Sequence, residues 1–143
     1  MPSYKTTSYE ETECIGIELG KNAKPGDVIA LDGDLGAGKT VMTRGIAKGM
    51  GLMDEDVCSP TFTIVNEYVD ALDGSTAEVP LFHFDTYRLG DSEDFINAGL
   101  DEYFYRGGVC VIEWSSVIED ILPPDTIKIR ITGSGSERLI EVT

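Results

Sequence analysis

The stretch that decides the fold is GDLGAGKT at positions 33–40, which fits the pattern GxxxxGK[ST]. The apolar run DVIALD at 27–32 precedes it, and an amphipathic stretch at 39–50 follows it. Strand, glycine-rich loop and helix therefore follow one another, as in a phosphate-binding loop. This context argues against a glycine turn that carries a lysine by accident.

The residue types in this pattern suit an anion and a metal ion. Glycines let backbone N–H groups turn toward phosphate, the lysine reaches the terminal phosphates, and the hydroxyl ligates Mg²⁺ at a helix N-terminus. Gly33, Gly38, Lys39 and Thr40 occupy these positions. We therefore expect the chain to bind the phosphates of ATP together with Mg²⁺.

Two carboxylates are candidates to complete such a site. Asp85 closes the run LFHFD, and Glu113 closes VCVIE, the better match to a hydrophobic Walker B strand. A phosphate-bound Mg²⁺ needs an acid at the end of a neighbouring strand. Either acid can serve the metal while the other positions the attacking water as a general base, and the sequence does not divide these roles.

Four further side chains have two readings each. Thr61, in SPTF at 59–62, either senses the third phosphate or belongs to a simple Ser-Pro turn. His83 shares a strand face with Asp85, although a lone histidine in a strand is more often structural. Arg88 contacts phosphate or a carboxylate, and Trp114 either packs near the nucleotide or belongs to the core.

Periodicity and turn residues place the remaining elements. The spacing of Ser8 and Glu11 predicts a capping box at the start of the first helix. We expect helices over 9–22, from 91 or 92 through 96, and over 100–105, and strands over 62–68, 79–84, 109–113, 126–132 and 137–142. The predicted fold is one α/β domain over 1–143, P-loop NTPase-like, with a mixed sheet that includes antiparallel strands and is flanked by helices.

The charge limits the partners that the chain can contact directly. It has 26 acidic and 11 basic residues among 143, a net charge of −15. Such a molecule repels polyanions, so a role on nucleic acid requires a partner. The acids are read as a solvated surface, with a dedicated acidic docking face as the alternative.

The three cysteines show no CxxC spacing, so neither a disulfide framework nor a zinc site is indicated. No apolar run is long enough to span a bilayer, and the first residues do not read as a signal peptide. We expect a cytoplasmic protein that contacts no membrane.

Four motifs together resemble one family: GDLGAGKT at 33–40, SPTF at 59–62, HFDTYR at 83–88 and VIEW at 111–114. With SYEET at 8–12, they closely resemble the bacterial tRNA threonylcarbamoyladenosine biosynthesis ATPases, the TsaE family. The resemblance implies that Thr40 and Glu113 ligate Mg²⁺ and that Asp85 serves the catalytic centre with Lys39 and Thr61. It further implies that the phosphates are held by Leu35, Gly36, Ala37, Gly38, Lys39 and Thr40, and that the base lies between Tyr9–Thr12 and Gly135–Arg138.

The same resemblance implies a function and its partners. Members of that family support transfer of a threonylcarbamoyl group to adenosine 37 of tRNA without performing the transfer. Their ATPase serves a partner complex of a transferase subunit and its paralogous scaffold subunit, and they meet tRNA only indirectly. Because no arginine is obviously placed over the third phosphate, we expect slow hydrolysis by the chain alone. Two other classes stay open as alternatives: a small-molecule or nucleoside kinase, and a GTP switch, for which no NKxD motif is present.

Overall fold

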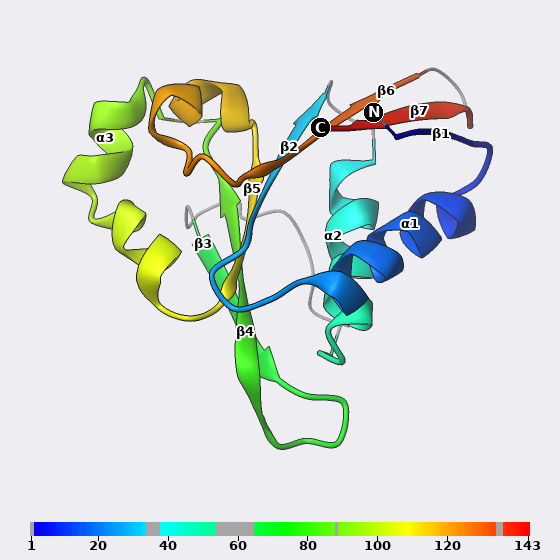
Figure 1. Cartoon of the computed structure of the whole chain (residues 1–143), viewed down its shortest axis with the longest axis horizontal. Coiled ribbons are helices and arrows are strands. Elements are labelled where there is room, and N and C mark those ends of the chain that lie inside the picture. The colour runs from blue at the N-terminus through cyan, green and yellow to red at the C-terminus, as the bar shows by residue number, and fades with distance from the viewer. Residues whose placement is uncertain (1, 34–37, 54–64, 88, 134–135) are drawn as a thin grey trace.

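The computed structural model describes residues 2–33, 38–53, 65–87, 89–133 and 136–143. Its centre is a seven-stranded mixed sheet of order β1-β7-β6-β2-β5-β4-β3 (Figure 1). The strands are β1 (Ser3–Thr6), β2 (Val28–Gly33), β3 (Val65–Asp70), β4 (Thr76–Asp85), β5 (Val109–Glu113), β6 (Ile127–Thr132) and β7 (Arg138–Val142). The four consecutive strands β6, β2, β5 and β4 are parallel to one another, and antiparallel pairs lie toward both edges. The predicted α/β fold is confirmed.

Helices cover the sheet on both faces (Figure 1). On one face lie α1 (Tyr9–Asn22) and α2 (Lys39–Gly49), and on the other lie α3 (Ser92–Asn97) and two 3₁₀ helices, η1 (Leu100–Tyr105) and η2 (Ser115–Ile121). Each face has its own apolar core. The first core includes Ile29, Leu31, Met42 and Ile46; the second includes Phe84, Phe95, Ile112 and Ile118.

Strand β5 lies between β2 and β4, and all five of its residues are buried, as its apolar sequence predicts. Its last residue, Glu113, is paired with Leu31 of β2 and with Asp85 of β4. Since paired residues of parallel strands point to the same face, both acids project toward the face that carries α2. The register therefore brings two distant acids to one edge of the sheet.

Helices α1 and α2 are parallel and pack backbone against backbone. A Cβ placed on Gly45 would lie 2.3 Å from the carbonyl oxygen of Glu13, and one on Gly49 would lie 2.1 Å from that of Ile17. Only glycine permits so close an approach. Because the helices run in the same direction, their N-termini lie together at one end of the pair.

The predicted elements are present, with a few differences. Ser8 caps α1 by accepting from the backbone N–H of Glu11, but the Glu11 carboxylate accepts from the N–H of Thr7 rather than that of Ser8, so the predicted capping box is displaced by one residue. Strand β1 is not predicted, because its four residues carry no alternating pattern and are ordered by pairing with β7. Helix η2 is also missed. The start of the strand predicted at 62–68 lies outside the described residues.

Candidate functional site

Lys39 is placed at the point where β2 ends and α2 begins. Its ammonium donates a hydrogen bond of 2.6 Å to the carbonyl oxygen of Gly33, the last residue of β2. The residue is only 5% exposed. Gly38 precedes it with a φ of 107°, a conformation that favours glycine. A buried ammonium at a helix N-terminus makes this a strongly anion-attracting position.

Trp114 belongs to this site. The Lys39 ammonium lies 3.9 Å from the centre of the Trp114 ring, and the Tyr87 ring lies 4.9 Å away on centroids. Trp114 has a φ of 61°, and among the described residues it is the only one other than glycine with a positive φ. Bulky residues rarely adopt this conformation, which tends to occur at functional sites. Trp114 therefore packs against the lysine of the GDLGAGKT motif, and its packing near a nucleotide stays a prediction.

Glu113 is 3% exposed, and its Oε2 forms a short hydrogen bond with Nε2 of His83, which is fully buried. The other ring nitrogen, Nδ1, is buried and has no hydrogen-bond partner among the described residues. The histidine of the HFDTYR motif therefore lies directly against the strand-end acid. Neither periodicity nor spacing predicts this contact.

Asp85 is half-buried at the end of β4, beside Glu113. Burial raises the pKa of its carboxyl above the usual value, and the negative charge of Glu113 adds to this effect. The backbone N–H of Tyr87, which donates to Oδ1 at 2.9 Å, opposes the rise. A carboxylate with a raised pKa is a better proton acceptor than an ordinary one.

Thr86 forms hydrogen bonds with the backbone at the end of β5, at Glu113 and Trp114. Its hydroxyl, fully buried, donates to the carbonyl oxygens of Trp114 at 2.6 Å and Glu113 at 3.1 Å. Its backbone N–H also donates to the carbonyl oxygen of Glu113, at 3.2 Å. Sequence reasoning missed this residue; its position between two candidate residues in HFDTYR was the available signal.

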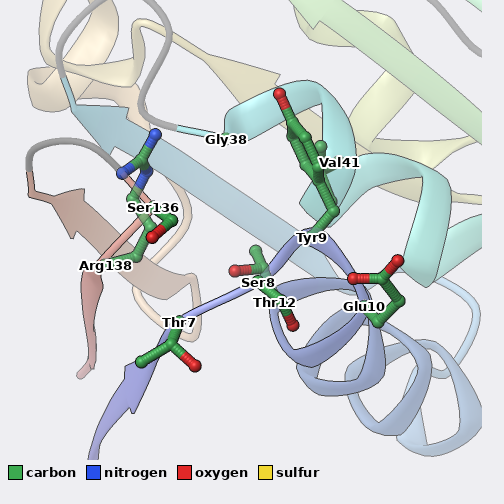
Figure 2. Close-up of a pocket in the computed structure, with 9 residues that line it drawn as sticks. All are labelled: Thr7, Ser8, Tyr9, Glu10, Thr12, Gly38, Val41, Ser136 and Arg138. Carbon is green, nitrogen blue, oxygen red and sulfur yellow. The ribbon is translucent and has the colours of Figure 1, made fainter.

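A pocket of about 350 Å³ opens beside this site, between the N-termini of α1 and α2 and the start of β7 (Figure 2). Tyr9 and Val41 line one side, and Ser136 and Arg138 line the other. The pocket is lined by Thr7, Ser8, Tyr9, Glu10, Thr12, Gly38, Val41, Ser136 and Arg138. Described residues from both segments expected to enclose a base line this one pocket, and that a base binds there stays a prediction. The sequence analysis does not predict Thr7, Ser8 and Val41 as lining residues.

The structure brings Lys39, Asp85, Glu113 and Trp114 together, with Thr40 in the first turn of α2 and Tyr9 at the adjoining pocket. Several predicted residues lie outside the described part of the chain: Leu35, Gly36, Ala37, Thr61, Arg88 and Gly135.

The donor groups fit Mg²⁺ only if phosphate oxygens complete its shell. No cluster of three or more metal-ligating side chains occurs among the described residues. Glu113 and Asp85 carry carboxylate oxygens at one edge of the sheet, and Thr40 carries a hydroxyl in the first turn of α2. Mg²⁺ prefers such a set, with one or two carboxylates plus substrate phosphates.

In the ranges that the structure covers, no helix is long and apolar enough to cross a membrane. The seven-stranded mixed sheet with helices on both faces defines a single α/β domain. The chain belongs to the TsaE family, because the model of that family, "Threonylcarbamoyl adenosine biosynthesis protein TsaE", matches residues 6–140.

Relatives cover most of the chain. A protein of Bacillus subtilis named tRNA threonylcarbamoyladenosine biosynthesis protein TsaE is 47% identical over 135 residues, which span 94% of this chain and 79% of the relative. A protein of the same name from Treponema pallidum is 37% identical over 134 residues, which span 92% of this chain and 93% of the relative. The crystal structure of Bacillus subtilis YdiB is similar with a TM-score of 0.77 at 40% identity, covering 99% of this chain and 83% of that one. These matches agree with the resemblance carried by the motifs.

Proposed function

We propose that this protein is a Mg²⁺-dependent ATPase that supports threonylcarbamoylation of adenosine 37 in tRNA by acting on the transferase complex. The observation that carries the ATPase proposal is the buried Lys39 ammonium at the N-terminus of α2, beside the strand-end acids Asp85 and Glu113. Membership of the TsaE family supports the tRNA pathway.

Lys39 and the start of α2 would bind the triphosphate. The positive end of the helix dipole and the ammonium both attract anions, and the left-handed Gly38 turns the backbone toward them. Two of the partners of Lys39, a carbonyl oxygen and an aromatic face, carry only partial negative charge. Phosphate oxygens bind an ammonium more strongly than either partner does, because the bond is charge-assisted on both sides.

The pocket lined by Tyr9 and Val41 would hold the adenine. Its volume of about 350 Å³ lies at the lower end of the range for small-molecule sites. Tyr9 is 75% exposed, so its ring has a free face on which a base can stack. Gly38 lines the same pocket, which joins the base site to the start of α2 and so to the phosphate site.

Thr40 and Glu113 would hold Mg²⁺, which when bound neutralises negative charge on the phosphate oxygens during hydrolysis. Asp85 would orient the attacking water and accept its proton. Its Oδ1 already accepts from the Tyr87 N–H, so Oδ2 is the oxygen assigned to the water. The pKa of this carboxyl, raised by burial, suits that task.

The partners we propose are the transferase subunit and its paralogous scaffold subunit, with tRNA reached only through them. A net charge of −15 makes this chain a poor direct tRNA ligand but suits a basic protein surface. No arginine of the described chain lies among the groups that meet at Lys39, so we expect slow hydrolysis by the protein alone, faster in the complex.

Two measurements test this function. Radiolabelled ATP is incubated with the protein alone and with a metabolite panel; release of inorganic phosphate supports an ATPase, whereas label on an acceptor would establish a kinase. A pull-down from cell extract with and without ATP then tests the pathway. Recovery of the tRNA-modifying subunits supports it, and their absence under both conditions contradicts it.

A further inference from the structure

His83 lies on β4 and reaches diagonally across to the end of β5. Its register partner on β5 is Val111, two residues before Glu113, and diagonal neighbours at this spacing are within reach of a long or ring side chain. The imidazole Nε2 meets Oε2 of Glu113 in a contact closed off from solvent. The contact thus joins two neighbouring strands beside the proposed nucleotide site.

The second ring nitrogen of His83 lowers the stability of the fold. Nδ1 is buried without a partner among the described residues, and the nearest ring is Tyr68, tilted by 33° at 6.2 Å between centroids. A buried polar atom without a hydrogen bond destabilises a fold, because it has lost its bonds to water. A leucine or phenylalanine would fill this apolar space without that cost. Unlike leucine or phenylalanine, the histidine provides a hydrogen bond to Glu113.

We propose that His83 is a positioning residue, which donates from Nε2 to Glu113 and so holds that carboxylate in one orientation for its work on the magnesium nucleotide. This inference rests on the proposed ATPase function. An ionised carboxylate can only accept, so the ring proton lies on Nε2. Groups that orient a metal-ligating side chain typically change metal affinity or activity 10–100-fold when removed.

Three substitutions separate the hydrogen bond from the packing. In His83→Gln, the amide nitrogen stands as many bonds from Cβ as Nε2 does, so it can still donate to Glu113. In His83→Asn, the amide reaches only as far as Nδ1. His83→Leu fills the space and has no donor. Val111→Ala is the matched control, because it disturbs packing opposite His83 and leaves the contact intact.

Each protein is measured in four ways: thermal unfolding, the Kd for ATP in EDTA, the Mg²⁺ concentration that gives half-maximal hydrolysis, and kcat. We expect all variants to keep the Kd for ATP in EDTA within about twofold of the wild-type value, because Lys39 is untouched. His83→Asn and His83→Leu should lose at least tenfold in Mg²⁺ requirement or kcat. His83→Gln should restore most of this loss, and Val111→Ala should lower only the melting temperature.

The outcomes divide cleanly. The proposal is supported if His83→Asn and His83→Leu lose activity or need more Mg²⁺ and His83→Gln recovers most of the loss. A change mainly in the Mg²⁺ requirement would assign Glu113 to the metal. A change mainly in kcat would assign it to the attacking water. Wild-type values for Asn and Leu, or a folded Gln variant as impaired as Leu, would overturn the proposal. Wild-type protein that neither binds nor hydrolyses ATP would instead overturn the proposed function itself, and this inference with it.

Discussion

The ammonium nitrogen of Lys39 lies 3.9 Å from the centre of the Trp114 ring while it donates to the carbonyl oxygen of Gly33. The two residues belong to different elements: Lys39 is the first residue of α2, and Trp114 follows the last residue of β5. A cation over an indole face is worth about 0.5–2 kcal/mol, less than a charge-assisted bond to phosphate. A bound triphosphate should therefore draw Lys39 away from the ring.

The first prediction concerns tryptophan fluorescence. Trp114 is the only tryptophan of the chain, so its emission reports this site alone. Addition of Mg-ATP should change the intensity or the wavelength saturably, because the charge over the ring moves. A fluorescence titration gives the Kd directly. A flat signal, together with nucleotide binding measured by calorimetry, would show that Lys39 stays on the ring.

The second prediction concerns Lys39→Ala. The lost ammonium leaves phosphate charge without a partner where a charge-assisted bond is worth about 1.5–3 kcal/mol, so the Kd for ATP should rise at least tenfold. Isothermal titration calorimetry measures this change. Lys21→Ala, at an exposed position in the last turn of α1, is the control. An unaltered affinity in Lys39→Ala would remove the lysine from the phosphate site.

The third prediction concerns the two strand-end acids. Asp85→Ala and Glu113→Ala should keep ATP binding and lose at least tenfold in hydrolysis, which is about 1.4 kcal/mol or more in the barrier. Phosphate release under single-turnover conditions measures the effect. Glu78→Ala, an exposed acid on the same strand as Asp85, should behave as wild type. Full turnover in both site variants would exclude these acids from the chemistry.

The fourth prediction concerns Thr86. Thr86→Val keeps the shape but removes the hydroxyl that bonds two carbonyl oxygens, so the free energy of unfolding should fall by about 1–3 kcal/mol. The rate of hydrolysis should also fall, because the backbone that positions Glu113 loses these hydrogen bonds. Urea denaturation and phosphate release measure the two effects. Thr86→Ser, which keeps the donor, should retain most of both. Wild-type stability and hydrolysis in Thr86→Val would show that the hydroxyl bonds contribute to neither.

The sequence predicts elements whose cause is local and misses contacts whose cause is tertiary. The apolar run at 109–113 and the capped helix after Ser8 carry their own signals, and both are present. Strand β1 exists only because β7 lies beside it, and no local pattern reveals it. Asp85 and Glu113 each close an apolar run in the sequence, and the sheet pairs them as neighbouring strand ends. The bonds of His83 and Thr86 depend on strand register, which a single sequence does not specify.

The last prediction concerns the close contact between α1 and α2 at Gly45 and its effect on the pocket proposed for the base. Gly45→Ala puts a methyl group where the backbone carbonyl oxygen of Glu13 lies 2.3 Å away, and a backbone atom cannot rotate aside. The helices must separate, at a cost of about 1–3 kcal/mol in stability. Tyr9 and Gly38 line one pocket from the two helix N-termini, so their spacing should change and adenine should bind less well. We expect the Kd for ATP to rise toward that for tripolyphosphate, with the latter unchanged, as calorimetry would show. A variant that is destabilised but keeps the wild-type ratio of the two constants would place the base away from this pocket.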